Sequence, residues 1–166
     1  AQSELPSELL RESQPLSPSD FDYRRAQRHL LSITGLGPRV VGTFENEIAA
    51  PALIVEELQK LKKESTGRFH LEVEVIRSSG AFHDAHFLGG FSNVYRGVTS
   101  VVARLSLEND HATDAKVAEG ELPELPALLI NAHVDSAPGS PGASDDGVGA
   151  ALMLEVARAL VHCEPG

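Results

Sequence analysis

The chain has 166 residues, 42% of them hydrophobic, which suffices for one domain with a core but not for two of ordinary size. Its formal net charge of −10 argues against nucleic acid and against an anionic membrane surface as partners. With one cysteine, the chain cannot form an internal disulfide framework. The sequence also lacks a run of about 18 apolar residues that would predict a membrane span.

The N-terminal part predicts an arm followed by a helix. Residues 1–18 are rich in Ser, Glu and Pro, a composition typical of a loose arm, so we expect the folded part over residues 19–166. The helix should begin near Ser17 to Ser19 and end before Gly35, a residue suited to a left-handed cap.

A second helix is expected over residues 45–64. Its spacing places three apolar side chains on one face and predicts an ion pair between Glu56 and Lys60; the apolar residues are Ile54, Leu58 and Leu61. Pro51 lacks an amide donor and crowds the preceding turn, so we expect a kink or a late start there.

The middle of the chain predicts strands. Residues 69–75 alternate apolar and polar side chains, and so do residues 101–107. Between them, residues 78–97 are rich in Gly and Phe and predict a loop, and the acidic residues 108–125 predict a solvated hairpin loop. Residues 126–132 form a continuous apolar run, typical of a strand buried on both faces.

A last helix is expected from about Gly147 to His162. The order helix, helix, strand, strand, strand, helix predicts an α/β fold, a three-layer sandwich with a mixed central sheet. Ligands in such folds gather beyond the carboxyl ends of the strands, which directs attention to the segment between residue 132 and the last helix.

That segment contains four side chains capable of metal chemistry, those of His133, Asp135, Asp145 and Asp146. His133 and Asp135 are two residues apart, so at an extended strand end both side chains project to the same side. A carboxylate is the usual anchor for the second nitrogen of a metal-binding imidazole. The turn at residues 140–144 then delivers Asp145 to the helix start, where its two oxygens could bridge two divalent ions.

Each of these residues also has an ordinary structural explanation. A His-x-Asp pair occurs often by chance, and an Asp at a helix start is more often an N-cap than a ligand. Asp146 could equally stabilise the helix dipole from the first turn. The conjunction of apolar run, His-Val-Asp-Ser, Ser-Asp-Asp-Gly and apolar helix favours the metal site.

The stretch NAHVDSAPGSPGASDD at residues 131–146 resembles the zinc aminopeptidases and related carboxypeptidases that use two co-catalytic zinc ions. Supporting stretches are ITGLGPRVVGTFENE at 33–47 and FLGGFSNVY at 87–95, and the likeness is strongest to the endoplasmic reticulum group of these metallopeptidases. The resemblance implies that His133 and Asp145 are zinc ligands, Asp145 bridging both ions, and that Asp135 orients the histidine in a catalytic role. It assigns no role to Asp146.

The family's remaining parts, a glutamate pair, a further carboxylate and a late histidine, follow the helix at which this chain stops. We therefore expect the N-terminal part of a zinc exopeptidase domain, inactive alone. In the complete protein, zinc would assist hydrolysis of N-terminal residues from a peptide substrate. The endoplasmic reticulum group implies a lumenal catalytic domain, with membrane association only through segments outside this chain. The oligomeric state is not indicated.

Three alternatives stay open. A glutaminyl cyclase would use a single zinc on the same fold, although Ser-Asp-Asp-Gly fits the two-metal peptidases better. A non-catalytic, ectodomain-like relative would keep the fold for binding partners. An acidic α/β scaffold would bind no metal at all.

Overall fold

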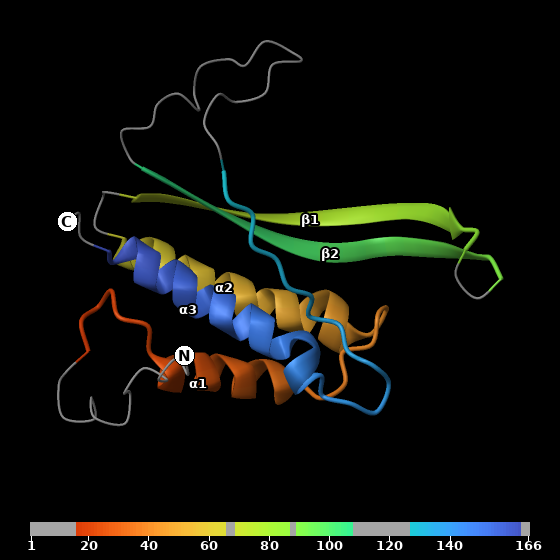
Figure 1. Cartoon of the computed structure of the whole chain (residues 1–166), viewed down its shortest axis with the longest axis horizontal. Coiled ribbons are helices and arrows are strands. Elements are labelled where there is room, and N and C mark those ends of the chain that lie inside the picture. The colour runs from red at the N-terminus through yellow and green to blue at the C-terminus, as the bar shows by residue number, and fades with distance from the viewer. Residues whose placement is uncertain (1–15, 66–68, 87–88, 108–126, 164–166) are drawn as a thin grey trace, which may run out of the picture.

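The structure, a computed structural model, describes residues 16–65, 69–86, 89–107 and 127–163. A long β-hairpin lies across helices α2 and α3, and α1 packs against α3 on the side away from the hairpin (Figure 1). The elements in chain order are α1 (Tyr23–Thr34), the π-helical turn η2 (Glu45–Ala49), α2 (Ala50–Glu64), β1 (Phe69–Asp84), β2 (Phe91–Leu107), the π-helical turn η4 (Ala143–Gly147) and α3 (Val148–Val161).

Helix α1 begins later than its sequence predicts. The Asp22 side chain accepts a hydrogen bond from the Arg24 amide at 2.9 Å and caps the helix, whereas Ser17 and Asp20 form a separate turn. The predicted start near Ser17 to Ser19 is therefore wrong, because the Asp20 carboxylate closes a separate turn at Ser17 and the helix begins only after Asp22. The helix does end before Gly35, but Gly35 is right-handed with φ −62°.

Helix α2 confirms the expectation for Pro51. The π-helical turn η2 occupies residues 45–49, and α2 starts at Ala50 with Pro51 in its first turn, where a missing amide donor costs nothing. Leu58 and Leu61 are buried, and Lys60 Nζ lies 2.9 Å from Glu56 Oε1, which confirms the predicted ion pair.

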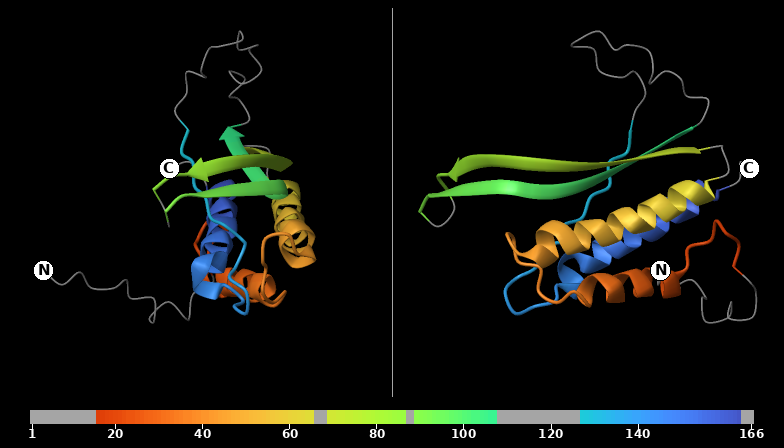
Figure 2. Two further views of the ribbon diagram at one scale, coloured as in Figure 1. Left: turned by 90° about the vertical axis from the view of Figure 1, so that its right-hand side faces the viewer. Right: turned by 180° about the vertical axis from the view of Figure 1, so that it is seen from behind.

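The hairpin is longer than the alternating runs suggest. Strands β1 and β2 are antiparallel, with Leu71 opposite Leu105, and Leu71 packs with Leu61 and Val161 in the core. The prediction of a loop over residues 78–97 is largely wrong, because β1 continues to Asp84 and β2 begins at Phe91. Cross-strand pairing continues β1 past Gly80, β2 includes Gly97, and the end of the hairpin reaches beyond the helices (Figure 2).

The strand expected at 126–132 is not formed over its described part. Residues 127–132 have no regular secondary structure, and Leu128 and Leu129 are 87% and 85% exposed. A strand needs a neighbouring strand to satisfy its amides, and within the described residues the sheet has two strands only. Residues 1–15 of the arm expected over 1–18, and the acidic loop at 108–125, lie outside the described residues.

The α/β class is confirmed in partial form. The described residues combine helices with a two-stranded antiparallel sheet, and neither a mixed sheet nor a three-layer sandwich is present among them. Helix α3, over Val148–Val161, agrees with the helix expected from Gly147 to His162.

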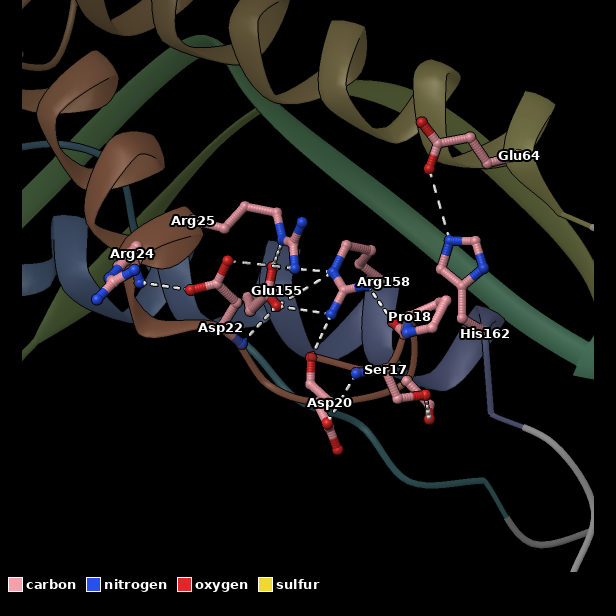
Figure 3. A network of polar contacts seen from close by, with 11 residues as sticks. Ser17, Pro18, Asp20, Asp22, Arg24, Arg25, Glu64, Glu155, Arg158 and His162 are labelled. Atoms are coloured by element: carbon pink, nitrogen blue, oxygen red, sulfur yellow. Dashed lines mark hydrogen bonds and ion pairs between the residues drawn. The ribbon is translucent and has the colours of Figure 1, made fainter. Parts of the chain in front are cut away.

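A buried charge network joins α1 to α3. The Glu155 side chain is fully buried and accepts hydrogen bonds from the Asp22 amide, from Arg25 Nε and from Arg158 (Figure 3). The Arg158 guanidinium also donates to the carbonyl groups of Pro18 and Asp20. This network fixes the packing of α1 on the helix that follows the candidate site.

Candidate metal site

The candidate site lies in the irregular segment that leads into α3. Gly142 has a positive φ of 55°, and the chain then turns through η4, where the Asp145–Asp146 peptide bond is cis. Asp145 has extended backbone angles (φ −140°, ψ 91°), so the regular geometry of α3 does not include it.

The two adjacent aspartates make different contacts. Asp146 Oδ1 accepts a hydrogen bond from the Gly149 amide at 3.2 Å, in the first turn of α3. The capping contact considered for an aspartate at this helix start thus belongs to Asp146. Asp145 Oδ1 instead lies 3.0 Å from Nε2 of His133.

His133 lies between two carboxylates. Its Nδ1 is 3.1 Å from Asp135 Oδ1 and 3.2 Å from the Asp135 carbonyl oxygen, while Nε2 points to Asp145. The structure thus brings together the three residues singled out in the sequence. The side chains are exposed by 52% for His133, 46% for Asp135 and 88% for Asp145, so an ion or a substrate can reach them.

The electrostatics of the ring follow from this arrangement. Burial lowers the pKa of His133, but the charge of Asp135 and the hydrogen bonds to Asp135 and Asp145 outweigh it, so the pKa lies above its ordinary value. A metal ion at Nε2 would have to displace a proton, because only the neutral ring binds metal.

The donor set fits zinc. Imidazole nitrogen and carboxylate oxygen are ordinary zinc ligands, and bond lengths of about 2.1 Å at a tetrahedral angle place two such donors about 3.4 Å apart. The observed separation of 3.0 Å between His133 Nε2 and Asp145 Oδ1 is close to that value. Within the described part of the chain, no group of three or more His, Cys, Asp or Glu side chains is arranged to hold a metal ion.

Arg39 is the residue of this site that sequence reasoning missed. Its side chain is fully buried and donates to carbonyl groups in the segment between His133 and Asp145, among them those of Val134 and Gly142. An arginine in a Gly/Pro-rich loop normally predicts a solvated side chain. Its burial results from tertiary contacts, for which the local pattern carries no signal.

Residues 116–165, which include the three candidate residues, match the model of Peptidase family M28. Together with the similarity of most of the chain to named metallopeptidases, this match supports that family for the chain and confirms the predicted family resemblance.

The chain is 38% identical over 141 residues to endoplasmic reticulum metallopeptidase 1 of Rattus norvegicus, and to the protein of the same name of Homo sapiens; each alignment covers 85% of this chain and 14% of the relative. A vacuolar membrane protease of Candida albicans is 54% identical over 41 residues, covering 25% of this chain and 5% of the relative. The chain thus spans about one seventh of the length of the metallopeptidases it matches. No solved structure matches it.

Proposed function

We propose that this chain is the N-terminal part of the catalytic domain of a two-zinc metallopeptidase that removes N-terminal residues from peptides. The observation that carries the proposal is the approach of His133 Nε2 to Asp145 Oδ1 at 3.0 Å, with Asp135 on the opposite ring nitrogen. The family match supports the metallopeptidase class, and the donor geometry supports zinc.

Each of the three residues has a distinct role in the proposal. His133 holds one zinc ion through Nε2, and Asp145, whose carboxylate is 88% exposed, has a second oxygen available for the other ion. Asp135 accepts a hydrogen bond from Nδ1 and so fixes the tautomer and orientation of the ring. When bound, zinc supplies Lewis-acid polarisation of the scissile carbonyl and a water molecule of lowered pKa.

The chain contributes only part of the ligand set in this proposal. A catalytic zinc takes about three protein ligands, and the described residues offer a pair and an orienting carboxylate. The further ligands and the general base would come from polypeptide outside the described residues. The 166-residue chain alone is then inactive toward peptides.

We propose a location in the endoplasmic reticulum and peptides as substrates, which the names of the relatives support, and we propose that the catalytic domain lies in the lumen. None of the helices in the described ranges combines the length and the hydropathy of a membrane span. Attachment to the membrane would depend on segments outside this chain.

Zinc titration of the chain by calorimetry tests the proposal. The variants His133→Ala and Asp145→Ala should lose zinc binding. His70→Ala is the matched control, because His70 is likewise half exposed (50%) and lies 3.3 Å from the Glu72 carboxylate, and it should bind zinc like the unaltered chain. Equal binding by all four proteins would contradict the zinc assignment.

Aminoacyl-arylamide substrates test the claim of inactivity separately. The 166-residue chain should show no zinc-dependent hydrolysis above that of its His133→Ala variant. Robust turnover would show that the chain is a complete enzyme and would refute the proposal that it is a part of one.

A further inference from the structure

We propose that Arg39 is a positioning residue of the candidate zinc site: by binding the backbone next to each ligand, within the segment that joins them, it sets the separation between His133 and Asp145. This inference rests on the proposed function of these two residues as zinc ligands. Arg39 contacts neither of their side chains, so its effect is exerted through the backbone that carries them.

The Arg39 guanidinium donates hydrogen bonds to carbonyl groups next to His133 and to carbonyl groups just before the turn that carries Asp145. Arg39 Nε donates to the Val134 carbonyl at 2.6 Å, and Val134 is the residue between His133 and Asp135. Nη1 donates to the Pro141 carbonyl at 2.8 Å and Nη2 to the Gly142 carbonyl at 3.4 Å, just before the turn that carries Asp145. One rigid, planar group therefore joins the two segments.

The same guanidinium is anchored to the body of the fold. Nη1 also donates to the carbonyl groups of Ile33, at the end of α1, and Gly37, at 3.2 and 3.1 Å. Ile33 is itself fully buried. The ligand segments are thus held against a packed helix end.

Backbone contacts of Arg39 reinforce the arrangement. The Arg39 amide donates to Ser136 Oγ at 2.8 Å, and the Ser136 amide donates to the Arg39 carbonyl at 2.9 Å. Ser136 Oγ in turn donates to the Ser140 carbonyl at 2.8 Å. Segment 134–142 is therefore held by an internal hydrogen bond from Ser136 to Ser140 and by the hydrogen bonds from Arg39 to its carbonyl groups.

The chemistry of the contacts explains why arginine is needed. Burial lowers the pKa of Arg39, and the nearby charge of Asp135 opposes that shift. Lysine would offer a compact ammonium with three donors and could not reach carbonyl groups on several sides in one plane. We therefore expect lysine to replace arginine only in part.

The test compares Arg39→Met, Arg39→Lys and the matched control Arg158→Met. Arg158 is also largely buried, with 12% of its side chain exposed, and it also donates to backbone carbonyls, but it belongs to the α1–α3 network. Two quantities are measured for each folded protein: the zinc affinity by calorimetry, and the imidazole NMR signal of His133 in the zinc-free chain. The free energy of unfolding is measured alongside them.

Arg39→Met should weaken zinc binding by at least about tenfold and displace or broaden the His133 signal, with Arg39→Lys in between. Arg158→Met should lower the free energy of unfolding but leave the zinc affinity within about twofold and the His133 signal in place. The inference is wrong if Arg39→Met preserves both quantities, or if Arg158→Met changes them as much.

Two further variants keep the outcomes separable. If Arg39→Met does not fold, Ser136→Ala removes only the hydroxyl that links Arg39 to Ser140; it should move the His133 signal and weaken zinc binding several-fold, and no change in either would overturn the inference. His133→Ala reports on the site itself: if it binds zinc like the unaltered chain, the proposed function fails. If His133→Ala abolishes binding while the Arg39 variants bind normally, only the role of Arg39 fails.

Discussion

Gly142 shows at the scale of one residue how tightly the candidate site is built. Its φ of 55° is left-handed, and a Cβ built there would lie 2.5 Å from Ser136 Cβ and 2.8 Å from the Asp145 carbonyl oxygen. Both contacts are shorter than packed atoms tolerate, and both neighbours belong to the site. Only glycine allows the chain to pass between Ser136 and Asp145.

We therefore expect Gly142→Ala to lower the free energy of unfolding by about 2–4 kcal/mol, the sum of an unfavourable φ and a steric clash. Gly139→Ala is the matched control: its φ is 82°, but no heavy atom lies within 4 Å of the added Cβ, so about 1 kcal/mol should be lost. Urea denaturation measures both. Equal losses would show that the clash at Gly142 is relieved by movement of the loop.

The residues of the site differ in how far the sequence reveals them. His133, Asp135 and Asp145 could be singled out because their residue types and spacing belong to metal chemistry, and the structure places them together. Arg39 could not be found this way, because its contacts join residues about 100 positions apart in the chain. Long-range hydrogen bonding leaves no local pattern.

At the scale of elements, the hairpin divides into an inner part on the helices and an outer part beyond them. Leu71 is 2% exposed in the core, whereas Val75 is 49% exposed and Val94 is 76% exposed. The helical elements thus contact the hairpin from its inner end as far as Thr99, whose amide donates to the Glu47 side chain of η2.

Leu71→Ala should accordingly cost about 2–4 kcal/mol of the free energy of unfolding, because it leaves a cavity beside Leu61 and Val161. Val75→Ala, four residues along the same strand, should cost less than about 1 kcal/mol. Thermal denaturation compares the two variants. Similar costs would mean that Val75 packs more closely than its exposure indicates.

The α1–α3 network predicts a dependence of stability on pH. Burial raises the pKa of Glu155, but hydrogen bonds from Arg158, the Asp22 amide and Arg25 outweigh it, so the pKa lies below the ordinary value of 4.5. A depressed carboxyl pKa stabilises the fold fully above the unfolded value. That stabilisation is lost as the pH falls through the lower, folded value.

Glu155→Gln should remove this acid dependence, and near neutral pH it should cost about 3 kcal/mol, because Arg158 loses its buried counter-charge. Glu56→Gln, which alters an exposed pair with Lys60, should leave both the stability and its pH profile unchanged within error. Urea denaturation at a series of pH values from neutral down to about pH 3 gives both profiles. An unchanged acid profile in Glu155→Gln would contradict the assignment.

The sequence predicted helices and strands correctly where neighbouring residues determine the structure, and it failed where pairing between strands determines it. The late start of α2 at Ala50, with Pro51 in its first turn, and the span of α3 follow from local chemistry, and the structure agrees. The glycines within residues 78–97 suggested a loop, yet Gly80 pairs with Tyr95 across the strands and β1 continues to Asp84. Residues 127–132 have strand composition but no paired neighbour, so composition alone predicted a strand that the described structure lacks.

At the scale of the whole molecule, the candidate zinc ligands depend on the fold for their proximity. His133 and Asp145 are 12 residues apart, and the segment between them is bound by Arg39, passes through the left-handed Gly142 and leads into α3. The unfolded chain holds no such pair at a fixed distance. An ion that binds this pair therefore binds the folded state in preference to the unfolded state.

Zinc should consequently raise the free energy of unfolding, by about 2.7 kcal/mol when its free concentration is 100 times the dissociation constant. Denaturation curves with and without a chelator measure the difference. Magnesium should have little effect, because it prefers octahedral oxygen coordination and the pair includes an imidazole nitrogen. His133→Ala should lose the zinc effect and His70→Ala should keep it, since His70 is paired with Glu72 and lies on β1, outside the candidate site. Stabilisation that persists in His133→Ala would mean that zinc acts elsewhere on the chain, and the pair would then no longer explain the metal dependence of the fold.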